Sequence, residues 1–455
     1  MANLILWNSY DGSDLTSHPF VRPLGCHQIA NWLSNFGYTV KVIDFCSILT
    51  PDQVIHLTEK NIDKDTIAIG LSTTFTKKVI PTWAEFAKNY IENRYTKIKW
   101  ILGGRKELVS VTEYDWINFI DKDENAVLKF LDENTSRQIS RKEYDIASDN
   151  KHLVGNLGIT KHEVLPIELS RGCQFSCRFC SYPHIGKNKG TYIRKSNNIE
   201  EIFLKNYYEY GTTRYAFMDD TCNENETKIT DLAKIAQRLP FELEWVGYNR
   251  LDLIGRKPYT ANILKDSGLR STFFGIESFN KESSALVGKG WNGKYAKDFL
   301  LELKDIWGDR INWMLGFIIG LGHETIKEII ETDMWCVDND MYSWDYSALH
   351  ISENKDKKYK SEFELNYEKY GYRFTSHSWH NRYWDTTKSI NFQKEMNENA
   401  KSRNRISTFR LMELGGAGYD FNFLIGMKLN EFNISEYNHK VKNLVDEYFK
   451  YQINL

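Results

Sequence analysis

The chain has 455 residues, a formal net charge of −2 and a hydrophobic content of 41%. This length predicts about two or three domains, and the near-neutral charge argues against a dedicated nucleic-acid-binding protein, whose surface is ordinarily strongly basic. No apolar run approaches the length of a membrane span, and the first residues lack the pattern of a signal peptide. The 7 cysteines are few and clustered, which suits a reducing compartment, so we expect a cytoplasmic protein.

Strands and helices are predicted to alternate over the first 135 residues. Apolar runs predict strands at 2–7, 39–44, 66–71 and 99–102, and an edge strand at 116–120. Helical periodicity predicts helices at 23–36, 50–61, 78–95 and 124–134. Such alternation indicates a parallel sheet with helices on both faces. We therefore predict a Rossmann-like domain over residues 1–135.

Polar residues and glycines follow the predicted strands of this domain. They are, in chain order, Ser9, Asp11 and Gly12, then Ser72, Thr73 and Thr74, then Gly103, Gly104 and Arg105. Ligands of open parallel sheets bind at the carboxyl ends of the strands. This edge of the sheet is therefore the expected ligand-binding face.

Three cysteines follow the polar stretch 136–160, which we interpret as a linker. The apolar run 164–169 predicts a buried strand, and Cys173, Cys177 and Cys180 come after it on one short loop. Most [4Fe–4S] clusters have four cysteine ligands, so three thiolates on such a loop would leave one iron open to a small molecule. Structural zinc sites use four closed ligands, and His184 as a fourth ligand keeps zinc open as an alternative.

Five further strands are predicted after the cysteine loop. They lie at 214–218, 243–247, 270–275, 312–320 and 345–350, with a helix at 199–210 between the cysteine loop and the first of them. Together with the strand at 164–169 they give six strand–helix units over residues 161–355. This predicts an incomplete barrel, whose open side admits larger substrates than a closed eight-stranded barrel.

The cysteine loop resembles that of the radical S-adenosylmethionine (SAM) enzymes. Those enzymes carry the spacing C-x-x-x-C-x-aromatic-C after the first strand of a partial barrel, and Phe179 stands at the aromatic position. The resemblance implies a [4Fe–4S] cluster on Cys173, Cys177 and Cys180 whose fourth iron binds SAM. It also implies that one electron cleaves SAM to a 5′-deoxyadenosyl radical, so an electron donor such as flavodoxin or ferredoxin is an expected partner.

The turns after the later barrel strands resemble the SAM-binding turns of the same family. The implied cofactor-binding residues are Asp219 and Asp220 after the second strand, Arg250 after the third, Glu277 and Ser278 after the fourth and Gly320 after the fifth. Gly322 and His323 depart from the family's Pro and Gly in the last turn. The alternatives are a helix N-cap for one of the two aspartates and a surface position for Arg250.

The first domain resembles the cobalamin-binding domain that precedes the barrel in one subclass of these enzymes. There a Ser/Thr turn and a Gly-Gly turn contact the corrin and its nucleotide tail. Their counterparts here are Ser72, Thr73, Thr74, Gly103 and Gly104. The D-x-H-x-x-G loop whose histidine ligates cobalt is missing, and His18 and His27 lack its context. The alternative is a domain that keeps the fold without the cofactor.

Residues 356–455 are expected to form a mostly helical extension that caps the open barrel. Helices are predicted at 390–404 and 435–451, with Ser435 as the N-cap of the second. Candidates for a substrate-facing surface are His377, Trp379, His380 and Tyr383. Ordinary packing of aromatic side chains is the alternative.

Cys222 follows the second barrel strand, on the side where the resemblance places SAM. It is the candidate catalytic residue, as a donor of a hydrogen atom or as a covalent nucleophile. The alternative is a small buried apolar side chain, the commoner role of a free cysteine.

The sequence thus predicts an α/β enzyme with a Rossmann-like domain, a partial barrel and a helical extension. The resemblance implies radical SAM chemistry that ends either in cobalamin-dependent methylation of an unactivated carbon or in a cobalamin-independent rearrangement or oxidation. A zinc-binding protein without enzymatic activity is the remote alternative. We expect a small-molecule, nucleotide or peptide substrate. The basic stretch 187–195 is either a phosphate-binding loop or a solvated one.

Overall fold

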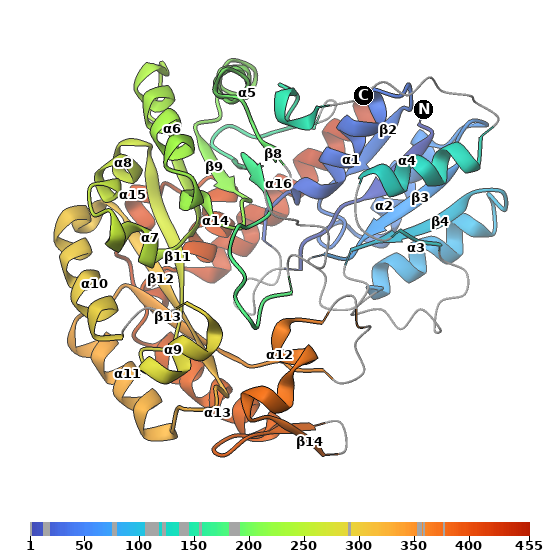
Figure 1. Ribbon diagram of the computed structural model, residues 1–455. Helices are drawn as coiled ribbons and strands as arrows, with labels where there is room; N and C mark the ends of the chain where they lie inside the picture. Colours follow the sequence, from blue (N-terminus) through green and yellow to red (C-terminus); the bar gives the residue numbers. More distant parts are fainter. Residues whose placement is uncertain are drawn as a thin grey trace.

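The computed structural model describes most of the chain. The described residues are 2–11, 19–74, 80–104, 118–120, 124–135, 145–153, 157–181, 192–289, 293–352, 357, 360–375 and 378–455. Figure 1 shows the N-terminal sheet and its helices in blue, the barrel strands from green to orange, and red C-terminal helices that run back between the two. Among the described helices, none has the length and apolarity that crossing a bilayer needs.

The N-terminal domain is a five-stranded parallel sheet in the order β2-β1-β3-β4-β5. Its strands are β1 (Leu4–Trp7), β2 (Val40–Ile43), β3 (Ala68–Ser72), β4 (Lys99–Gly103) and β5 (Asn118–Ile120). Its helices are α1 (Leu24–Ser34), α2 (Pro51–Asn61), α3 (Thr82–Glu92) and α4 (Glu124–Glu133). The predicted Rossmann-like fold and the predicted edge strand are both confirmed.

Alternating side chains of this sheet enter two separate cores. Leu4 and Leu6 pack with helices α1 and α4, whereas Ile5 and Trp7 pack with α2 and α3. This is the two-residue period of a strand covered on both faces. Helix α3 begins at Thr82 rather than at residue 78, because Pro81 is extended with ψ 148° and no helical turn precedes it in the described residues.

The second sheet is the predicted barrel of six parallel strands, in the order β13-β12-β11-β10-β9-β6. The strands are β6 (Val164–Ile167), β9 (Arg214–Phe217), β10 (Glu244–Asn249), β11 (Leu269–Glu277), β12 (Asn312–Ile319) and β13 (Ser343–Ala348). The helices that cover its outer face are α5 (Ser196–Tyr210), α6 (Glu226–Arg238), α7 (Leu251–Arg256), α8 (Thr260–Asp266), α9 (Lys281–Val287), α10 (Gly293–Trp307) and α11 (Ile326–Asp338). A short ribbon, β7 (Ser170–Arg171) with β8 (Tyr192–Ile193), flanks the cysteine loop.

Side-chain amides cover the free edge of the barrel sheet. The edge strand is β13, and Asn397 of helix α13 (Thr386–Lys401) both accepts from the Tyr346 amide and donates to its carbonyl, at 2.8 Å each. Asn404 makes the same pair of contacts with Trp344. An unpaired strand edge is prone to association, so these amides replace the missing seventh strand.

The C-terminal extension does more than the predicted capping of the barrel. Helix α14 (Thr408–Gly416) packs against the inner face of the barrel sheet, over β6, β10, β11 and β12. Helix α16 (Ile434–Asn454) returns to the N-terminal domain, where the Tyr448 hydroxyl accepts from the Asp44 amide at 3.0 Å. The predicted N-cap of α16 is wrong, since Asn433 and not Ser435 accepts from a first-turn amide, that of Glu436.

The remaining elements are short. They are α12 (Glu362–Leu365), α15 (Phe421–Leu424), the hairpin of β14 (Arg373–Thr375) and β15 (Ser378–His380), and 3₁₀ helices at Ile146–Ser148, Cys222–Glu224, Gly308–Arg310, Tyr367–Tyr370 and Leu429–Glu431.

A fully buried arginine joins the N-terminal domain to the barrel. The Arg22 guanidinium contacts Asp44 at 2.7 Å and Glu163, just before β6, at 2.6 Å. It also donates to the carbonyls of Leu157 and Gly158. Burial by itself would raise the pKa of Asp44, but His27 and Arg22 outweigh it and hold that pKa below its usual range. One buried arginine shared by two carboxylates thus links the two domains, alongside the ion pair of Arg171 with Glu124 at 2.9 Å.

Replacing Arg22 by methionine tests this junction. Arg22→Met would leave two buried carboxylates without their cation, which costs about 3–5 kcal/mol of unfolding free energy. Urea titration followed by tryptophan fluorescence measures the loss. The matched control is Arg238→Met, at an exposed pair with Glu200, which we expect to change the transition little because exposed ion pairs contribute little. Equal stability of the two variants would contradict the role given to Arg22.

Candidate functional site

Three cysteines reach the surface of the barrel at the carboxyl end of its first strand. Cys173, Cys177 and Cys180 are free thiols and half-buried, whereas the four other cysteines are buried. The chain turns into this loop at Gly172, whose φ of +87° suits glycine. Within it, the Cys180 amide donates to the Cys177 carbonyl at 3.0 Å. The fold therefore presents three thiols from one short turn.

Polar groups from neighbouring strand ends contact two of these thiols. Arg250 donates to the Cys177 sulfur at 3.4 Å, and the Thr221 hydroxyl lies 3.5 Å from the Cys173 sulfur. Arg250 is itself held by Asp252, with contacts of 2.9 and 3.0 Å, and stacks over Phe175 at 4.0 Å. Residues that follow the second and third barrel strands therefore surround two of the three sulfurs.

The donor chemistry of the loop fits an iron–sulfur cluster. As placed, no three His, Cys, Asp or Glu side chains of the described residues converge closely enough to hold a single metal ion, so the argument rests on ligand type and surroundings. Cysteine thiolates are the usual ligands of iron–sulfur clusters. Hydrogen bonds to the sulfurs, as from Arg250 to Cys177, tune such clusters. His184, the alternative zinc ligand, lies outside the described residues.

Asp219 supports the base of the cysteine loop. Its carboxylate accepts from the amides of Leu169 and Ser170 at 2.7 and 3.0 Å and from the Ser170 hydroxyl at 2.6 Å. Lys228 of α6 contacts it at 2.8 Å. The oxygens of Asp219 are thus engaged by the protein itself. Asp220 is half-buried beside it.

The alternative of an N-cap role for one of these aspartates is wrong. The N-cap of α6 is Asn225, which accepts from the Lys228 amide. Glu224, which the sequence analysis did not single out, accepts from the Gln174 amide at 3.2 Å and so also holds the cysteine loop.

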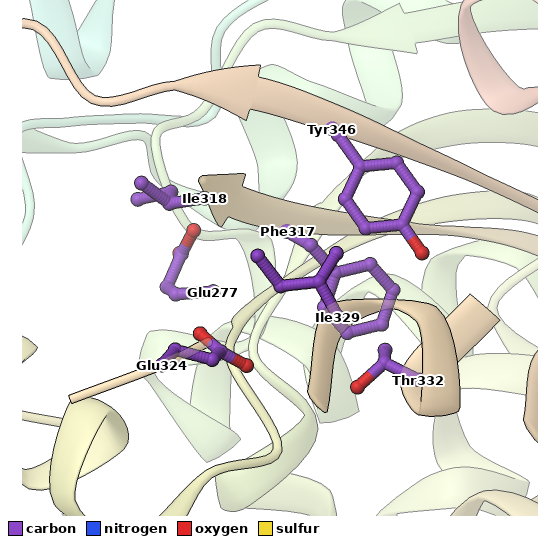
Figure 2. A pocket seen from close by; sticks show the side chains of 7 residues that line it. All are labelled: Glu277, Phe317, Ile318, Glu324, Ile329, Thr332 and Tyr346. Carbon is purple, nitrogen blue, oxygen red and sulfur yellow. The ribbon is translucent and has the colours of Figure 1, made fainter. Parts of the chain in front are cut away.

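A buried acidic group lies at the ends of β11 and β12. Glu277 has a φ of +67° at an irregularity in the β11–β12 pairing and forms a 2.8 Å ion pair with Lys289. In Figure 2 the carboxyl groups of Glu277 and Glu324 lie on one side of a small pocket, opposite the rings of Phe317 and Tyr346.

Ser278 is also buried here, and it hydrogen-bonds to Glu324. Burial raises the pKa of Glu324 to about 8. Glu277 and Ser278 are thus both buried at this strand end, and the sequence analysis did not identify Glu324 and Lys289 as their partners. A left-handed glutamate at a strand end is uncommon and concentrates at functional sites.

Gly320 turns the chain at the end of β12 with a φ of +110°. Its carbonyl accepts from Asn381 at 2.9 Å and from the Tyr372 hydroxyl at 3.3 Å, and the Trp379 ring packs against its Cα. Trp379 is only 1% exposed, which agrees with the packing alternative. His380 and Tyr383 are half-buried, and His377 lies outside the described residues.

Cys222 and Phe179 pack against the barrel core. Cys222 is 2% exposed and lies against Phe217 and Gly247. Burial raises the pKa of its thiol well above the usual range, so the surroundings disfavour a thiolate and agree with the buried apolar alternative. Phe179 is partly buried against the same core. Arg250 is 9% exposed, so the alternative that it is an ordinary surface arginine is wrong.

The Ser/Thr turn and the Gly-Gly turn of the N-terminal sheet meet. Thr73 donates to the Gly103 carbonyl through its amide at 2.8 Å and through its hydroxyl at 3.0 Å. Ser72 is half-buried, Thr74 and Gly104 are exposed, and a Cβ on Gly103 would meet nothing within 4 Å. An open, partly backbone-lined edge therefore remains where ligands of such sheets bind.

The described histidine of this region does not face that edge. His27 is fully buried on α1, and its Nε2 lies 3.0 Å from Asp44. His27, which lacks the context of the cobalt-ligating loop, is thus held inside the domain by Asp44. Gly12, His18 and Arg105 lie outside the described residues. The open turns leave room for a corrin, and His27 is not placed to ligate its metal.

Comparison with known proteins agrees with this geometry. The Radical SAM superfamily matches residues 167–336. A protein named an uncharacterized methyltransferase from Pyrococcus horikoshii is 30% identical over 165 residues, which are 36% of this chain and 34% of that protein. The match therefore spans about a third of the length of that relative.

Two solved structures resemble most of the chain. TsrM from Kitasatospora setae, a radical S-adenosylmethionine methyltransferase with cobalamin and a [4Fe-4S] cluster bound, has a TM-score of 0.61 at 15% identity over 83% of this chain and 81% of its own. OxsB, a cobalamin-dependent S-adenosylmethionine radical enzyme with aqua-cobalamin bound, has a TM-score of 0.56 at 17% identity. The likeness covers 81% of this chain and 56% of the OxsB chain. At these identities the likeness is one of fold.

The contact between Arg250 and Cys177 makes a testable prediction. If Cys177 holds a cluster, Arg250→Met removes a cation and a donor beside one of its ligands, so the reduced, more negative cluster would lose stabilisation. We expect its reduction potential to fall by on the order of tens of millivolts, measured by potentiometric titration with electron paramagnetic resonance. The matched control is Arg256→Met, an exposed arginine that contacts the same Asp252 at 3.8 Å. An equal shift in both variants would contradict the assignment.

Proposed function

We propose that this protein, a radical SAM enzyme, methylates an unactivated carbon of its substrate with the help of cobalamin. The observation that carries the proposal is the combination of two open strand-end edges in one chain. One edge bears the three half-exposed thiols, and the other bears the Ser/Thr and Gly-Gly turns. The fold likeness to TsrM, a methyltransferase with cobalamin and a cluster bound, extends over both halves.

Cys173, Cys177 and Cys180 are the residues that would hold the cluster. The cluster, when bound, supplies the electron that cleaves SAM. The chain positions the ligands through Asp219 and Glu224, which hold the loop from below. Arg250 places a cation beside Cys177. Glu277, Ser278 and Gly320 stand at neighbouring strand ends, where we propose that they orient SAM.

Ser72, Thr73, Thr74, Gly103 and Gly104 are the residues that would hold cobalamin. Cobalamin, when bound, carries the methyl group that is passed to the substrate carbon. The protein's part is to offer a flat, open edge: Gly103 leaves space in front of β4, and the hydrogen bonds from Thr73 fix the Gly103 carbonyl.

The second candidate function is a cobalamin-independent radical rearrangement or oxidation. It is favoured by one observation, the burial of His27 against Asp44, which leaves the open edge without a described cobalt ligand. In that case the first domain serves as a scaffold. In both cases we propose an electron donor such as flavodoxin or ferredoxin as a partner.

Loss of one thiol tests the assignment of the cluster. Cys177→Ala should lose its bound iron and its brown colour after anaerobic reconstitution and should no longer cleave SAM, because only two ligands remain. Iron analysis and chromatography of the adenosyl products measure both. Cys336→Ala, a buried cysteine on α11, should keep both. Iron retained by Cys177→Ala, or stoichiometric zinc in place of iron in the wild type, would refute the assignment.

A bulky side chain on the first domain tests the cobalamin edge. Gly103→Phe would fill the space in front of β4 without meeting protein atoms at its Cβ. We expect it to lose cobalamin binding in equilibrium dialysis while it retains its iron, because the cluster is held by the barrel. The control is Lys64→Phe, exposed in the loop before β3, at the opposite end of the same sheet. Equal binding of hydroxocobalamin by the two variants would sink the proposed location.

A further inference from the structure

Three aromatic rings meet on the inner face of the barrel sheet. Tyr248 of β10, Phe273 of β11 and Phe409 of α14 lie with ring centroids 5.4–5.7 Å apart in all three pairs. Although β10 is a central strand, Tyr248 is 39% exposed, and the other two rings are only partly buried. Aromatic side chains pack closely when they serve only as core. This cluster, which we call the ring triad, therefore presents apolar surface to the inside of the barrel.

A carboxyl group lies directly beside the ring triad. The Phe273 ring packs on the Cα of Gly316 in β12, where any side chain would collide with it. Asp345 of β13 is the cross-strand partner of Gly316. Paired residues of neighbouring strands point to the same face of a sheet, so Asp345 shares the inner face with the Phe273 ring, which covers Gly316 on the strand between them.

No group of the protein compensates Asp345 among the described residues. The Asp345 side chain makes no hydrogen bond and no ion pair with the described residues. The backbone amide and carbonyl groups of the neighbouring Trp344 and Tyr346, in contrast, are hydrogen-bonded by Asn404 and Asn397. The charged side chain that acts on the Asp345 carboxyl is Glu277, which is itself paired with Lys289 at 2.8 Å. Burial, and to a smaller extent the like charge of Glu277, raise the pKa of Asp345 to about 7. The Asp345 carboxyl is half-buried and has no donor among the described residues, so a ligand on the inner face of the sheet can supply one.

We propose that the substrate is a planar aromatic molecule that carries an ammonium group. The ring triad holds its aromatic body, and Asp345 accepts from its ammonium. Ring faces prefer offset or edge contact with another ring and also attract a cation, so both parts of the ligand suit the same surface. This inference rests on the proposed function, because the molecule that it describes is the substrate that the enzyme would methylate.

Asp345 lies on a different strand from the residues that we propose to orient SAM. The SAM-binding residues that we propose, Glu277 and Gly320, stand at the carboxyl ends of β11 and β12. Asp345 lies three positions before the end of β13, at the level of Gly316. In the strand register it lies four positions before Gly320 and one position below the level of Glu277, on the inner face where the Phe273 ring covers Gly316.

Binding of small probes to the full-length, cluster-reconstituted protein tests this inference. Isothermal titration calorimetry with tryptamine, without cobalamin or SAM, should show binding. Indole-3-propionate, with the ring and the opposite charge, and hexylamine, with the charge and no ring, should each bind at least about tenfold more weakly, since each lacks one of the two contacts. Because neither cofactor is present, failure here would leave the proposed methylation itself untouched.

Two variants and one control locate the contacts. Asp345→Asn keeps the shape and should weaken tryptamine binding by about tenfold or more, while Phe409→Leu should weaken it without changing the preference for the ammonium. The matched control Asp338→Asn, exposed on α11, should bind as the wild type. Unchanged tryptamine binding by Asp345→Asn would overturn the proposal. So would a loss of SAM binding by Asp345→Asn, since the carboxyl would then belong to the cofactor site.

The dependence of binding on pH needs no variant. Only the ionised form of Asp345 pairs with an ammonium, and its pKa is about 7. The affinity for tryptamine should therefore rise about ninefold between pH 6 and pH 8, as the ionised fraction rises from about one tenth to nine tenths. The elements packed against β13 add no other charge near Asp345 among the described residues. Strand β12 has no ionisable side chain, and α13 contacts β13 through the neutral Asn397, so the charged group that acts on Asp345 is Glu277. A flat profile over this range would contradict the role of Asp345.

Discussion

The buried contact of Arg22 with Asp44 and Glu163 is the constraint on which the rest of the molecule depends. All three side chains are fully buried, so neither carboxylate can leave the arginine without a large desolvation cost. Asp44 follows β2 of the first domain, and Glu163 immediately precedes the first barrel strand. The contact therefore fixes the carboxyl edge of one sheet relative to the other. Helix α16 strengthens it, because the Tyr448 hydroxyl bonds to the Asp44 amide and the Tyr448 ring lies beside the guanidinium.

With that junction in place, the chemistry-bearing groups come from the carboxyl ends of the strands. The cysteine loop follows β6, Asp219 follows β9, Arg250 follows β10, and Glu277 ends β11. Each is a short step from a rigid parallel strand, so the sheet sets the position of the side chain. The C-terminal extension then completes the arrangement from two sides, since α14 covers the inner face of the barrel and Trp379 packs against Gly320.

Much of this was predictable from local pattern. Alternating apolar runs predicted both sheets, and the apolar run 164–169 placed the cysteine loop at the end of a buried strand. What the sequence did not predict depends on contacts between distant residues. Asp219 was expected to meet a ligand, but the amides of Leu169 and Ser170 and the ammonium of Lys228 reach it only in the folded barrel.

The same limit applies to the C-terminal extension. The burial of Trp379 depends on a left-handed turn at Gly320, and the position of α14 on the inner face has no signature in its own sequence. Ser435 was a reasonable N-cap by residue type, yet Asn433 has the same chemistry and stands two residues earlier. Asp345 drew no attention as one acid in an apolar strand, because only the strand register brings it beside the ring triad.

The central claim is that the two open edges act in one reaction. The most direct measurement is the amount of S-adenosylhomocysteine and 5′-deoxyadenosine formed by anaerobically reconstituted protein with SAM and a strong reductant, with and without cobalamin. S-Adenosylhomocysteine that forms only when cobalamin is added is the result expected of a methylase that uses both edges. 5′-Deoxyadenosine alone, in equal amounts with and without cobalamin, would contradict the claim and leave the first domain a scaffold.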